Sequence, residues 1–305
     1  MRREFFRKTL ESSAFSTPIL PKKAEFPANS LWSREFCPAL GAFPPPARGS
    51  KTLHLDAVRR GGECLVSVTA AAISPVVKSR ASGAHYSASG RFPFVVGIDG
   101  VGRLDDGRRV YFVLPSFPFG GMAERTVVPS AQCLTLPTDL DDVTAAAIAN
   151  PGMLSWAALT ERARLKAGET VLVNGATGAP GRLAVQIAKR LGASKVIATG
   201  RSAKALEDVA SLGADVTIPL VEDDAALESA FMDAFAAGVD VVIDYLWGRS
   251  AERLLIAAAK AGKDSAPIRF VQVGSASGSD ISLPSAALRS SAIELMGSGI
   301  GSVPL

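Results

Sequence analysis

The sequence is poor in the residues that build metal sites and disulfide frameworks. Among its 305 residues there are three cysteines and two histidines. Cys37, Cys64 and Cys133 are far apart in the chain, which excludes a CxxC metal knuckle and makes a disulfide framework unfavourable. Cysteines scattered in this way usually act as small buried apolar residues. A zinc site would need an unusual ligand set drawn from these thiols, His54 and His85. The cysteine usage favours a reducing, cytoplasmic setting.

Long apolar runs and a strong charge imbalance are also missing. No apolar run reaches the roughly 18 residues that span a bilayer, so we predict no membrane partner. The net charge of +4 and the pI near 9.0 are a mild excess, without the clustered basic patch that nucleic-acid binding needs. Apolar residues make up 48% of the chain and charged residues 20%, which supports a sizeable core and excludes general disorder. The length allows two domains or one large one.

Residues 1–50 carry no persistent periodic pattern, and they are predicted to be an irregular N-terminal segment. The run Phe43-Pro44-Pro45-Pro46 supports this prediction. The basic, aromatic start is compatible with a transit peptide, but Glu4 and Glu11 argue against one. A disordered tail or a misassigned start is the favoured interpretation.

Residues 51–150 predict one β-rich domain. Short apolar–polar alternations, separated by Gly, Pro and Asp, are typical of strands at close spacing. The predicted strands are Thr52–Val58, Glu63–Ala71, Val95–Leu104, Arg109–Leu114 and Glu124–Val128. The Ala-rich stretch 144–165 has helical spacing, and because Pro151-Gly152 interrupts it, we predict two short helices linking the domains.

Residues 151–305 predict a second domain in which strands and helices alternate strictly. Strands such as VLVNG (171–175) and VDVVIDYL (239–246) are apolar on both faces, as in a parallel sheet covered by helices. The predicted strands are Thr170–Gly175, Lys195–Gly200, Asp215–Leu220, Val239–Leu246, Ile268–Gly274 and Ser291–Gly297. The predicted helices are Arg182–Leu191, Ala203–Leu212, Ala225–Ala237, Ala251–Ala261 and Leu283–Arg289. Left-handed glycine C-caps are predicted at Gly192, Gly213, Gly238 and Gly262.

A glycine motif, TVLVNGATGAPG (170–181), joins the first of these strands to its helix. Its three glycines would form the tight turn, admit the pyrophosphate and let helix and strand pack closely. The helix N-terminus offers N–H groups and positive charge to phosphates, and a proline is tolerated there. GxxGxxG alone is weak and fits an ordinary glycine-rich turn, but its place inside a βαβ unit favours dinucleotide binding. The predicted binding turn consists of Gly175, Ala176, Thr177, Gly178, Ala179, Pro180 and Gly181.

The end of the second strand distinguishes NAD from NADP. An NAD site usually places Asp or Glu there, whereas this chain has Gly200 followed by Arg201, Ser202 and Lys204. Two cations and a hydroxyl suit the 2′-phosphate of NADP(H) through charge-assisted hydrogen bonds. These four residues are therefore predicted to bind NADP(H); the alternative is a solvated first turn of a surface helix.

The chain resembles the zinc-independent medium-chain dehydrogenases/reductases, in their quinone oxidoreductase (zeta-crystallin-like) branch. The matching stretches are AGETVLVNGATGAPGRLAVQIAKRLGASKVIATGRS (167–202), RFPFVVGIDGVG (91–102) and GGMAERTVVPSAQCLTLP (120–137). The resemblance, which covers about residues 52–305, implies an N-terminal GroES-like β domain over 51–150. It implies an α/β Rossmann domain that binds NADP over 151–305, with a doubly wound parallel sheet in strand order 3-2-1-4-5-6. The substrate is expected in the cleft between them.

The resemblance also bears on metal and on chain length. Zinc-dependent members carry Gly-His-Glu where this chain reads Gly97-Ile98-Asp99, and their first zinc cysteine falls near Ile73-Ser74-Pro75. We therefore expect no metal and no zinc-polarised alcohol mechanism. Members usually begin near their first strand and continue past the sixth Rossmann strand. The chain is accordingly expected to be C-terminally truncated, as a fragment, a gene-model artefact or a degenerate relative.

By resemblance, the chain is an NADPH-dependent reductase of quinones or α,β-unsaturated carbonyl compounds. The cofactor supplies the hydride, and the protein stabilises charge developing on the carbonyl or enolate oxygen. Tyr86 is the candidate proton donor; the alternative is an exposed loop tyrosine. Because ligands bind outside the carboxyl ends of parallel strands, Tyr245, Val273, Gly274 and Ser275 are predicted to face the cofactor.

Other function classes share some of these sequence features. Short-chain dehydrogenases need a Tyr-x-x-x-Lys dyad, but the three tyrosines are followed at the fourth position by Gly90, Pro115 and Arg249, which excludes that class. A non-catalytic NADPH-binding or scaffold protein, and an inactive truncated relative, stay open as alternatives. The expected partner is a small carbonyl or quinone substrate, and the resemblance suggests a homodimer.

Overall fold

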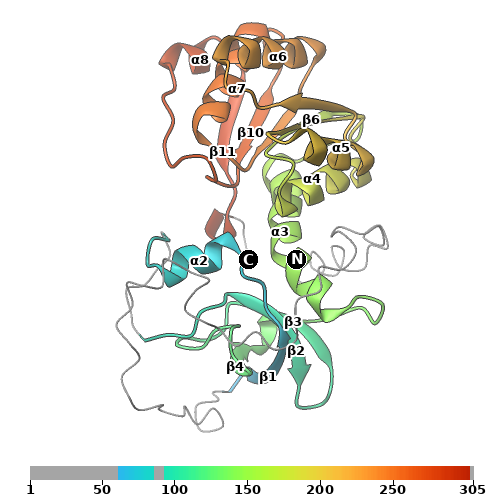
Figure 1. Ribbon diagram of the computed structural model, residues 1–305, viewed down its shortest axis with the longest axis vertical. Helices are drawn as coiled ribbons and strands as arrows, with labels where there is room; N and C mark the ends of the chain where they lie inside the picture. Colours follow the sequence, from blue (N-terminus) through green and yellow to red (C-terminus); the bar gives the residue numbers. More distant parts are fainter. Residues whose placement is uncertain (1–60, 86–92, 303–305) are drawn as a thin grey trace. The chain divides into compact units, whose positions relative to one another are not determined.

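Residues 61–85 and 93–302 are described by a computed structural model. The predicted irregular segment 1–50, the predicted strand Thr52–Val58 and Tyr86 lie outside these ranges. The chain divides into two compact units with a boundary between Ala147 and Ile148 (Figure 1). Within the described ranges, none of the helices combines the length and the apolar character that a bilayer-spanning helix needs.

The unit ending at Ala147, called here the β unit, is built on a five-stranded antiparallel sheet in the order β4-β1-β2-β3-β5. Its elements are β1 (Glu63–Ala70), α2 (Pro75–Ala81), β2 (Asp99–Leu104), β3 (Arg109–Val113), β4 (Arg125–Pro129), the 3₁₀ turn η5 (Ser130–Gln132) and β5 (Cys133–Thr135). Four predicted strands are thus confirmed, with β2 beginning four residues later than expected. Val96 and Gly97 bond to Met122 and Gly121 outside the ladder, which explains the late start.

A small apolar core lies on one face of this sheet. Val66, Val110, Phe112 and Val128 are buried together from β1, β3 and β4. Side chains alternate between the two faces of a strand, so positions 64, 66 and 68 of β1 share this face. Cys64 and Val68 accordingly pack against the same cluster.

The linking region is one helix rather than two. Helix α3 runs from Asp142 to Ala157 with Pro151 inside it, and the π-helical turn η6 (Ala158–Arg162) follows. A proline inside a helix removes one hydrogen bond and favours a break, so the sequence predicted an interruption. In the structure, Ser155 Oγ lies 2.8 Å from Pro151 O within the helix and 3.0 Å from Pro180 O of α4 (Ala179–Arg190), so a tertiary contact joins the part of the helix beyond the proline to α4.

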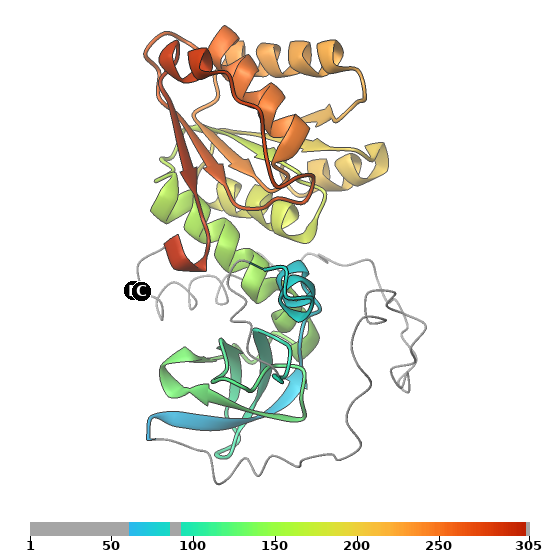
Figure 2. The same cartoon turned by 90° about the vertical axis from the view of Figure 1, so that its left-hand side faces the viewer.

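The second unit, residues 148–302, is called the Rossmann unit, and all pairs in its six-stranded sheet are parallel. Its order, β8-β7-β6-β9-β10-β11, is the predicted 3-2-1-4-5-6. The strands are β6 (Thr170–Asn174), β7 (Lys195–Gly200), β8 (Val216–Pro219), β9 (Val241–Asp244), β10 (Ile268–Gln272) and β11 (Ile293–Gly297). The helices are α4 (Ala179–Arg190), α5 (Ala203–Ser211), α6 (Asp224–Ala237), α7 (Gly248–Ala261) and α8 (Ser285–Arg289), followed by the 3₁₀ turn η7 (Ile300–Ser302). Figure 2 shows helices on both sides of this sheet.

Three of the four predicted left-handed glycine caps are confirmed. Gly192, Gly213 and Gly238 have φ angles of +89°, +115° and +103°. The prediction is wrong at Gly262, whose φ is −64°. A Cβ on Gly262 would overlap the carbonyl oxygen of Ala258, so this position needs glycine for close packing and not for its φ angle.

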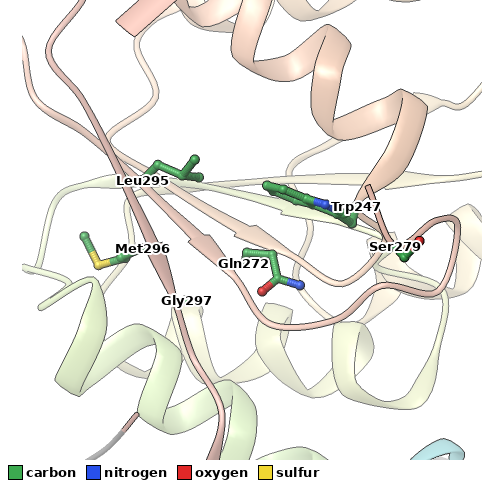
Figure 3. Close-up of a pocket in the computed structure, with 6 residues that line it drawn as sticks. All are labelled: Trp247, Gln272, Ser279, Leu295, Met296 and Gly297. Atoms are coloured by element: carbon green, nitrogen blue, oxygen red, sulfur yellow. The ribbon is translucent and has the colours of Figure 1, made fainter. Parts of the chain in front are cut away.

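A cavity of about 310 Å³ lies at the carboxyl ends of β10 and β11 (Figure 3). It is lined by Trp247, Gln272, Ser279, Leu295, Met296 and Gly297. In Figure 3, the side chains of Leu295 and Trp247 extend towards each other, while Met296 points to the other side of β11. None of the residues predicted from the sequence to bind the cofactor lines this cavity.

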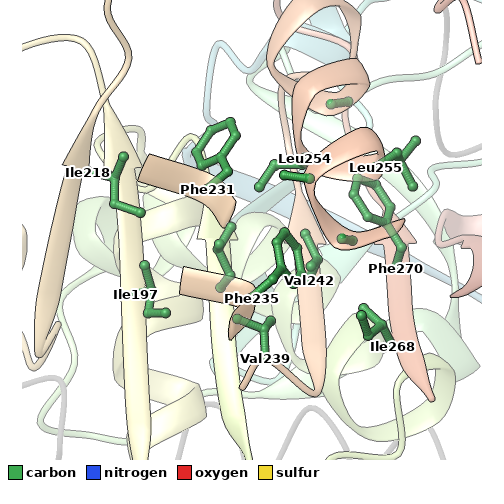
Figure 4. Close-up of a cluster of buried hydrophobic side chains, with 14 of the residues drawn as sticks. Ile197, Ile218, Phe231, Phe235, Val239, Val242, Leu254, Leu255, Ile268 and Phe270 are labelled. Atoms are coloured by element: carbon green, nitrogen blue, oxygen red, sulfur yellow. The ribbon is translucent and has the colours of Figure 1, made fainter. Parts of the chain in front are cut away.

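The main core of the Rossmann unit lies between the sheet and helices α6 and α7 (Figure 4). Phe231 and Phe235 from α6 and Leu254 from α7 are at most 1% exposed. They meet sheet residues of one face, including Val242 and Phe270. Burial of this much aromatic and aliphatic surface, at about 25 cal/mol per Å², fixes the sheet on which the site residues stand.

Candidate functional site

The glycine turn between β6 and α4 is tied to the neighbouring strand β7. Gly175 has a φ of +87°, a conformation that favours glycine. The Gly175 N–H donates to Thr199 Oγ1 at 3.0 Å, and the Ala176 N–H donates to the Thr199 carbonyl oxygen at 2.8 Å. The first two N–H groups of the turn are therefore used by the protein itself.

The next N–H groups of the turn are left for a ligand. Gly178 is the N-cap of α4, and no side chain caps this helix end. Among the described residues, the backbone N–H groups of Thr177 and Gly178 have no hydrogen-bond acceptor. Uncapped N–H groups at the start of a 12-residue helix form a ready site for a phosphate.

The three glycines differ in what surrounds them. A Cβ on Gly175 would come within 2.8 Å of Leu246 Cγ, and one on Gly181 would overlap the Gly175 carbonyl oxygen. At Gly178 the nearest atom to an added Cβ would be Pro180 Cδ, at 3.8 Å. Gly181 thus lets α4 lie directly on the turn, whereas Gly178 leaves open space where a pyrophosphate would approach. The turn fits a dinucleotide phosphate group.

A buried polar network supports the turn from below. Asn174 Nδ2 donates to Asp244 Oδ1 at 2.8 Å and to Ser250 Oγ at 3.0 Å, and Thr199 Oγ1 donates to Asn174 Oδ1 at 2.7 Å. Asn174, Thr199 and Asp244 are all 0% exposed. The network joins the carboxyl ends of β6, β7 and β9 and fixes the hydroxyl that holds the Gly175 N–H.

Asp244 closes this network against α7. Its carboxylate accepts the N–H groups of Leu246 and Trp247, which lie just before the helix starts at Gly248. Burial raises the pKa of Asp244 to about 6, and the hydrogen bonds from Leu246, Asn174 and Trp247 oppose the shift. Asp244 thus bonds to the turn before α7, and the N-cap residue of the helix is Trp247.

The predicted 2′-phosphate residues follow β7 on the same sheet edge. Arg201, Ser202 and Lys204 are all exposed. Among the described residues, neither Arg201 nor Lys204 makes an ion pair. Ser202 is the N-cap of α5, and its Oγ accepts the Ala205 N–H at 3.3 Å, which leaves the hydroxyl proton available as a donor. A Cβ on Gly200 would overlap Thr177 Cγ2, so glycine lets the turn approach β7.

The residues predicted at the ends of β9 and β10 lie together. The Val273 and Gly274 N–H groups donate to the Asp244 carbonyl oxygen at 2.7 and 3.1 Å. A Cβ on Gly274 would come within 2.6 Å of the Tyr245 carbonyl oxygen. Ser275 is exposed, and Val273 is half-buried. The ends of β9 and β10 thus lie together, and that Val273, Gly274 and Ser275 face the cofactor stays a prediction.

Tyr245 is held inside the protein. Its hydroxyl lies 2.7 Å from Ser155 Oγ, and only 7% of the residue is exposed. Burial raises the pKa of the Tyr245 hydroxyl, and the hydrogen bond with Ser155 opposes the shift. The phenol is therefore neutral and engaged with α3, and a contact between Tyr245 and a cofactor stays a prediction.

Asp99 stands where zinc-dependent relatives are expected to carry a glutamate. It is 1% exposed, and Tyr111 donates its hydroxyl proton to Asp99 Oδ2 at 2.8 Å. Asp99 Oδ1 is buried and has no hydrogen-bond partner in the described structure. Within the described ranges, no group of three or more His, Cys, Asp or Glu side chains could hold a metal ion.

Sequence reasoning missed the polar support of the turn. Asn174 is the last residue of β6 and Thr199 the penultimate residue of β7, each directly before a glycine, and the same strand-end argument that selected Tyr245 could have found them. Ser155 had no such signal, because its contacts with Pro180 and Tyr245 arise from the tertiary packing of α3. Tyr86, the candidate proton donor, lies outside the described residues.

Comparisons with known proteins show what the chain is similar to. The family described as zinc-binding dehydrogenase matches residues 180–304. A probable NADPH-dependent quinone reductase, tdiC, from Emericella nidulans is 31% identical over 240 residues, which cover 68% of this chain and 66% of that protein. This chain therefore spans just under two thirds of that curated relative.

Two solved structures extend the comparison. The quinone oxidoreductase of Thermus thermophilus, solved alone and with NADPH, is 29% identical with a TM-score of 0.65, covering 79% of this chain and 73% of that one. A probable oxidoreductase from Mycobacterium abscessus is 30% identical with a TM-score of 0.62, covering 80% and 73% of the two chains. With the glycine turn, the strand order and these relatives together, the chain belongs to the medium-chain dehydrogenase/reductase family, in its quinone oxidoreductase-like branch.

Proposed function

We propose that this protein binds NADPH and transfers its hydride to a quinone or an α,β-unsaturated carbonyl compound without zinc. The observation that carries the proposal is the glycine turn: the Thr177 and Gly178 N–H groups have no acceptor among the described residues, and an added Cβ on Gly178 would meet nothing closer than Pro180 Cδ at 3.8 Å. The relatives named as NADPH-dependent quinone reductase and quinone oxidoreductase support the cofactor and the substrate class.

The phosphate groups of NADPH would be held by this chain in two places. The pyrophosphate would lie over Gly178, where the helix N-terminus supplies N–H donors and partial positive charge. The 2′-phosphate would meet Arg201 and Lys204, whose cationic groups are exposed and free of ion pairs with described residues. No carboxylate stands at this position to bind the ribose diol of NAD.

When bound, NADPH supplies a hydride, and the chain's own residues position it and stabilise developing charge. Asn174, Thr199 and Asp244 hold the turn rigid through their buried hydrogen bonds. Tyr86 remains the candidate proton donor from the sequence. A zinc-free mechanism is supported by Ile98 and Asp99 at the positions of the expected histidine and glutamate ligands.

Cofactor binding is tested by calorimetry with NADPH and NADH on the full chain. We expect NADPH to bind more tightly, and Arg201→Ala and Lys204→Ala each to weaken NADPH about tenfold, because each removes one charge-assisted hydrogen bond. NADH affinity should stay unchanged in both variants. Arg190→Ala, an exposed cation at the opposite end of α4, is the matched control and should leave both affinities unchanged.

Catalysis is tested separately, by following the loss of NADPH absorbance with a panel of quinones and enones. Turnover in the presence of a metal chelator supports the zinc-independent reductase. Tight NADPH binding with no turnover on any acceptor would favour the non-catalytic binding protein instead. Absence of heat with either dinucleotide would overturn both. The cytoplasmic location and the homodimer stay predictions.

A further inference from the structure

Two cysteines that are far apart in the sequence meet in the β unit. The Sγ atoms of Cys64 and Cys133 lie 3.1 Å apart, although 69 residues separate them. A disulfide bond is about 2.05 Å long, so a movement of about 1 Å would join the two sulfurs. Both thiols are free and half-buried. Both side chains pack against apolar residues, as the sequence interpretation expected, and the structure adds their contact with each other.

Coiling of the sheet brings the thiols together. Cys64 lies on β1 and Cys133 on β5, and the sheet order places β2 and β3 between these strands. Both side chains pack against the cluster that contains Val66 and Phe112, so they line one inner face. Sheets twist and coil, and a coiled sheet can bring side chains from non-neighbouring strands into contact across that face. No spacing rule in the sequence would reveal such a pair.

We propose that Cys64 and Cys133 are a redox-active dithiol that closes to an intramolecular disulfide on exposure to a low-molecular-weight disulfide. In the first step, the thiolate of one cysteine attacks a sulfur of the small disulfide, forming a mixed disulfide and releasing one small thiolate. In the second step, the other cysteine's thiolate displaces the remaining small thiolate. Two protein thiols are oxidised, one small disulfide is reduced to two thiols, and the two protein protons end on those thiols.

The environment of the pair predicts slow closure. Burial raises the pKa of the Cys133 thiol, and the adjacent Cys64 adds to the shift, while Arg108 opposes it. Because the thiolate is the attacking species, a thiol that stays protonated reacts slowly with small oxidants. The pair therefore differs from a catalytic nucleophile. In a reducing compartment it stays open, and it closes when the small-thiol pool becomes oxidised.

Closure would cross-link most of the β unit. The bond would enclose residues 64–133, a span that begins in β1, ends in β5 and contains β2, β3 and β4. A disulfide stabilises a protein mainly by restricting the unfolded chain, more so for long loops. The oxidised β unit is therefore expected to unfold at a temperature several degrees higher than the reduced one.

The test uses the reduced full-length chain incubated with oxidised glutathione, then alkylated, digested and analysed by mass spectrometry. We expect one cross-linked peptide pair containing Cys64 and Cys133, both of which lose alkylation together, while Cys37 remains alkylated. The intact mass should fall by two hydrogen atoms. The unfolding midpoint of the β unit should rise by several degrees and return when a reductant is added.

Matched variants distinguish a specific pair from general oxidation. Cys37→Ser should close as the unsubstituted chain does, whereas Cys64→Ser and Cys133→Ala should each abolish the cross-link and the midpoint shift. Two different substitutions guard against a folding defect in one of them. Cross-links that run mainly through Cys37 or between two chains would overturn the proposal, and so would separate glutathionylation of Cys64 and Cys133 with no bond between them.

Discussion

Asp99 is the residue at which burial and charge conflict most clearly. Among the described residues, only one of its oxygens has a partner, the Tyr111 hydroxyl, and the other is buried without one. Burial raises the pKa of Asp99 to about 6 from 3.8, although the hydrogen bond from Tyr111 opposes the shift. Between about pH 4 and pH 6, the folded state therefore keeps a proton that the unfolded state has released. The contribution of Asp99 to the free energy of unfolding therefore falls as the pH rises through that window.

We predict that Asp99→Asn removes the Asp99 contribution to this fall. A shift of one pKa unit corresponds to about 1.4 kcal/mol. The difference in the free energy of unfolding between the unsubstituted chain and the variant should therefore change by roughly 2–3 kcal/mol from pH 4 to pH 7. The measurement is urea unfolding at a series of pH values, with hydrogen exchange of β2 and β3 reporting the β unit. Asp139→Asn, an exposed loop position, is the control. If the difference in the free energy of unfolding between the unsubstituted chain and Asp99→Asn did not change with pH, the Asp99 carboxyl group would have the same pKa in the folded and unfolded states.

Residue-scale features of this kind were only partly predictable. The exposed cations Arg201 and Lys204 stand where the strand-end rule places them, because that rule depends only on β7 ending at Gly200. The Cys64–Cys133 contact and the Tyr111–Asp99 bond depend on how the sheet coils and pairs, which local spacing does not encode. Residues brought together by packing need the fold before they can be recognised.

At the scale of elements, the glycines of the turn before α4 have two different roles, packing within the protein and access for a ligand. The sequence pattern does not distinguish them. Gly181 is required by the protein itself, because a Cβ there would overlap the Gly175 carbonyl oxygen. Gly178 has room for a Cβ, with Pro180 Cδ at 3.8 Å as the nearest atom. Its requirement for glycine, if the proposed function holds, comes from the ligand.

We predict that Gly178→Ala and Gly181→Ala both weaken NADPH binding, but for different reasons. Gly178→Ala should keep its unfolding midpoint and lose NADPH affinity by about tenfold or more, because the methyl group stands where the pyrophosphate approaches. Gly181→Ala should lower the stability of the Rossmann unit by about 1–3 kcal/mol through overpacking, with affinity falling as a consequence. Thermal unfolding and calorimetric titration are measured on both variants. Unchanged NADPH affinity in Gly178→Ala would place the phosphates elsewhere.

Helices and strands were predictable where the sequence pattern of apolar strands alternating with helices extends over many residues. Every strand and helix predicted after residue 169 is present, because each buried strand such as β9 is followed by a helix with its own stop signal. The three-residue strand β5 and the seven-residue helix α2 escaped, since neither is long enough to show a period. Helix α3 passes through Pro151 because the contacts of Ser155 hold it, and a local breaker rule does not include such contacts.

At the scale of the whole molecule, the proposed NADPH contacts all fall in one of the two units. The glycine turn and Arg201 belong to the Rossmann unit, as do Trp156 and Trp247. The third tryptophan, Trp32, lies outside the described residues. In a Trp32→Phe background, tryptophan fluorescence therefore reports the Rossmann unit alone, while hydrogen exchange of β1 and β3 peptides reports the β unit.

A ligand that binds only the folded state stabilises it by RT ln(1 + [L]/Kd), about 2.7 kcal/mol at a hundredfold excess over Kd. For a unit of this size, each kcal/mol raises the unfolding midpoint by about 2–4 °C, so NADPH should raise the fluorescence midpoint by about 5–10 °C. The β unit peptides should show a smaller gain in protection, because none of the proposed phosphate contacts lies there. NADH at the same concentration should shift the fluorescence midpoint less, since it has no 2′-phosphate for Arg201 and Lys204. Equal midpoint shifts with NADPH and NADH would show that Arg201 and Lys204 do not determine the cofactor preference. Increased protection in the β unit alone would show that the dinucleotide does not bind at the glycine turn.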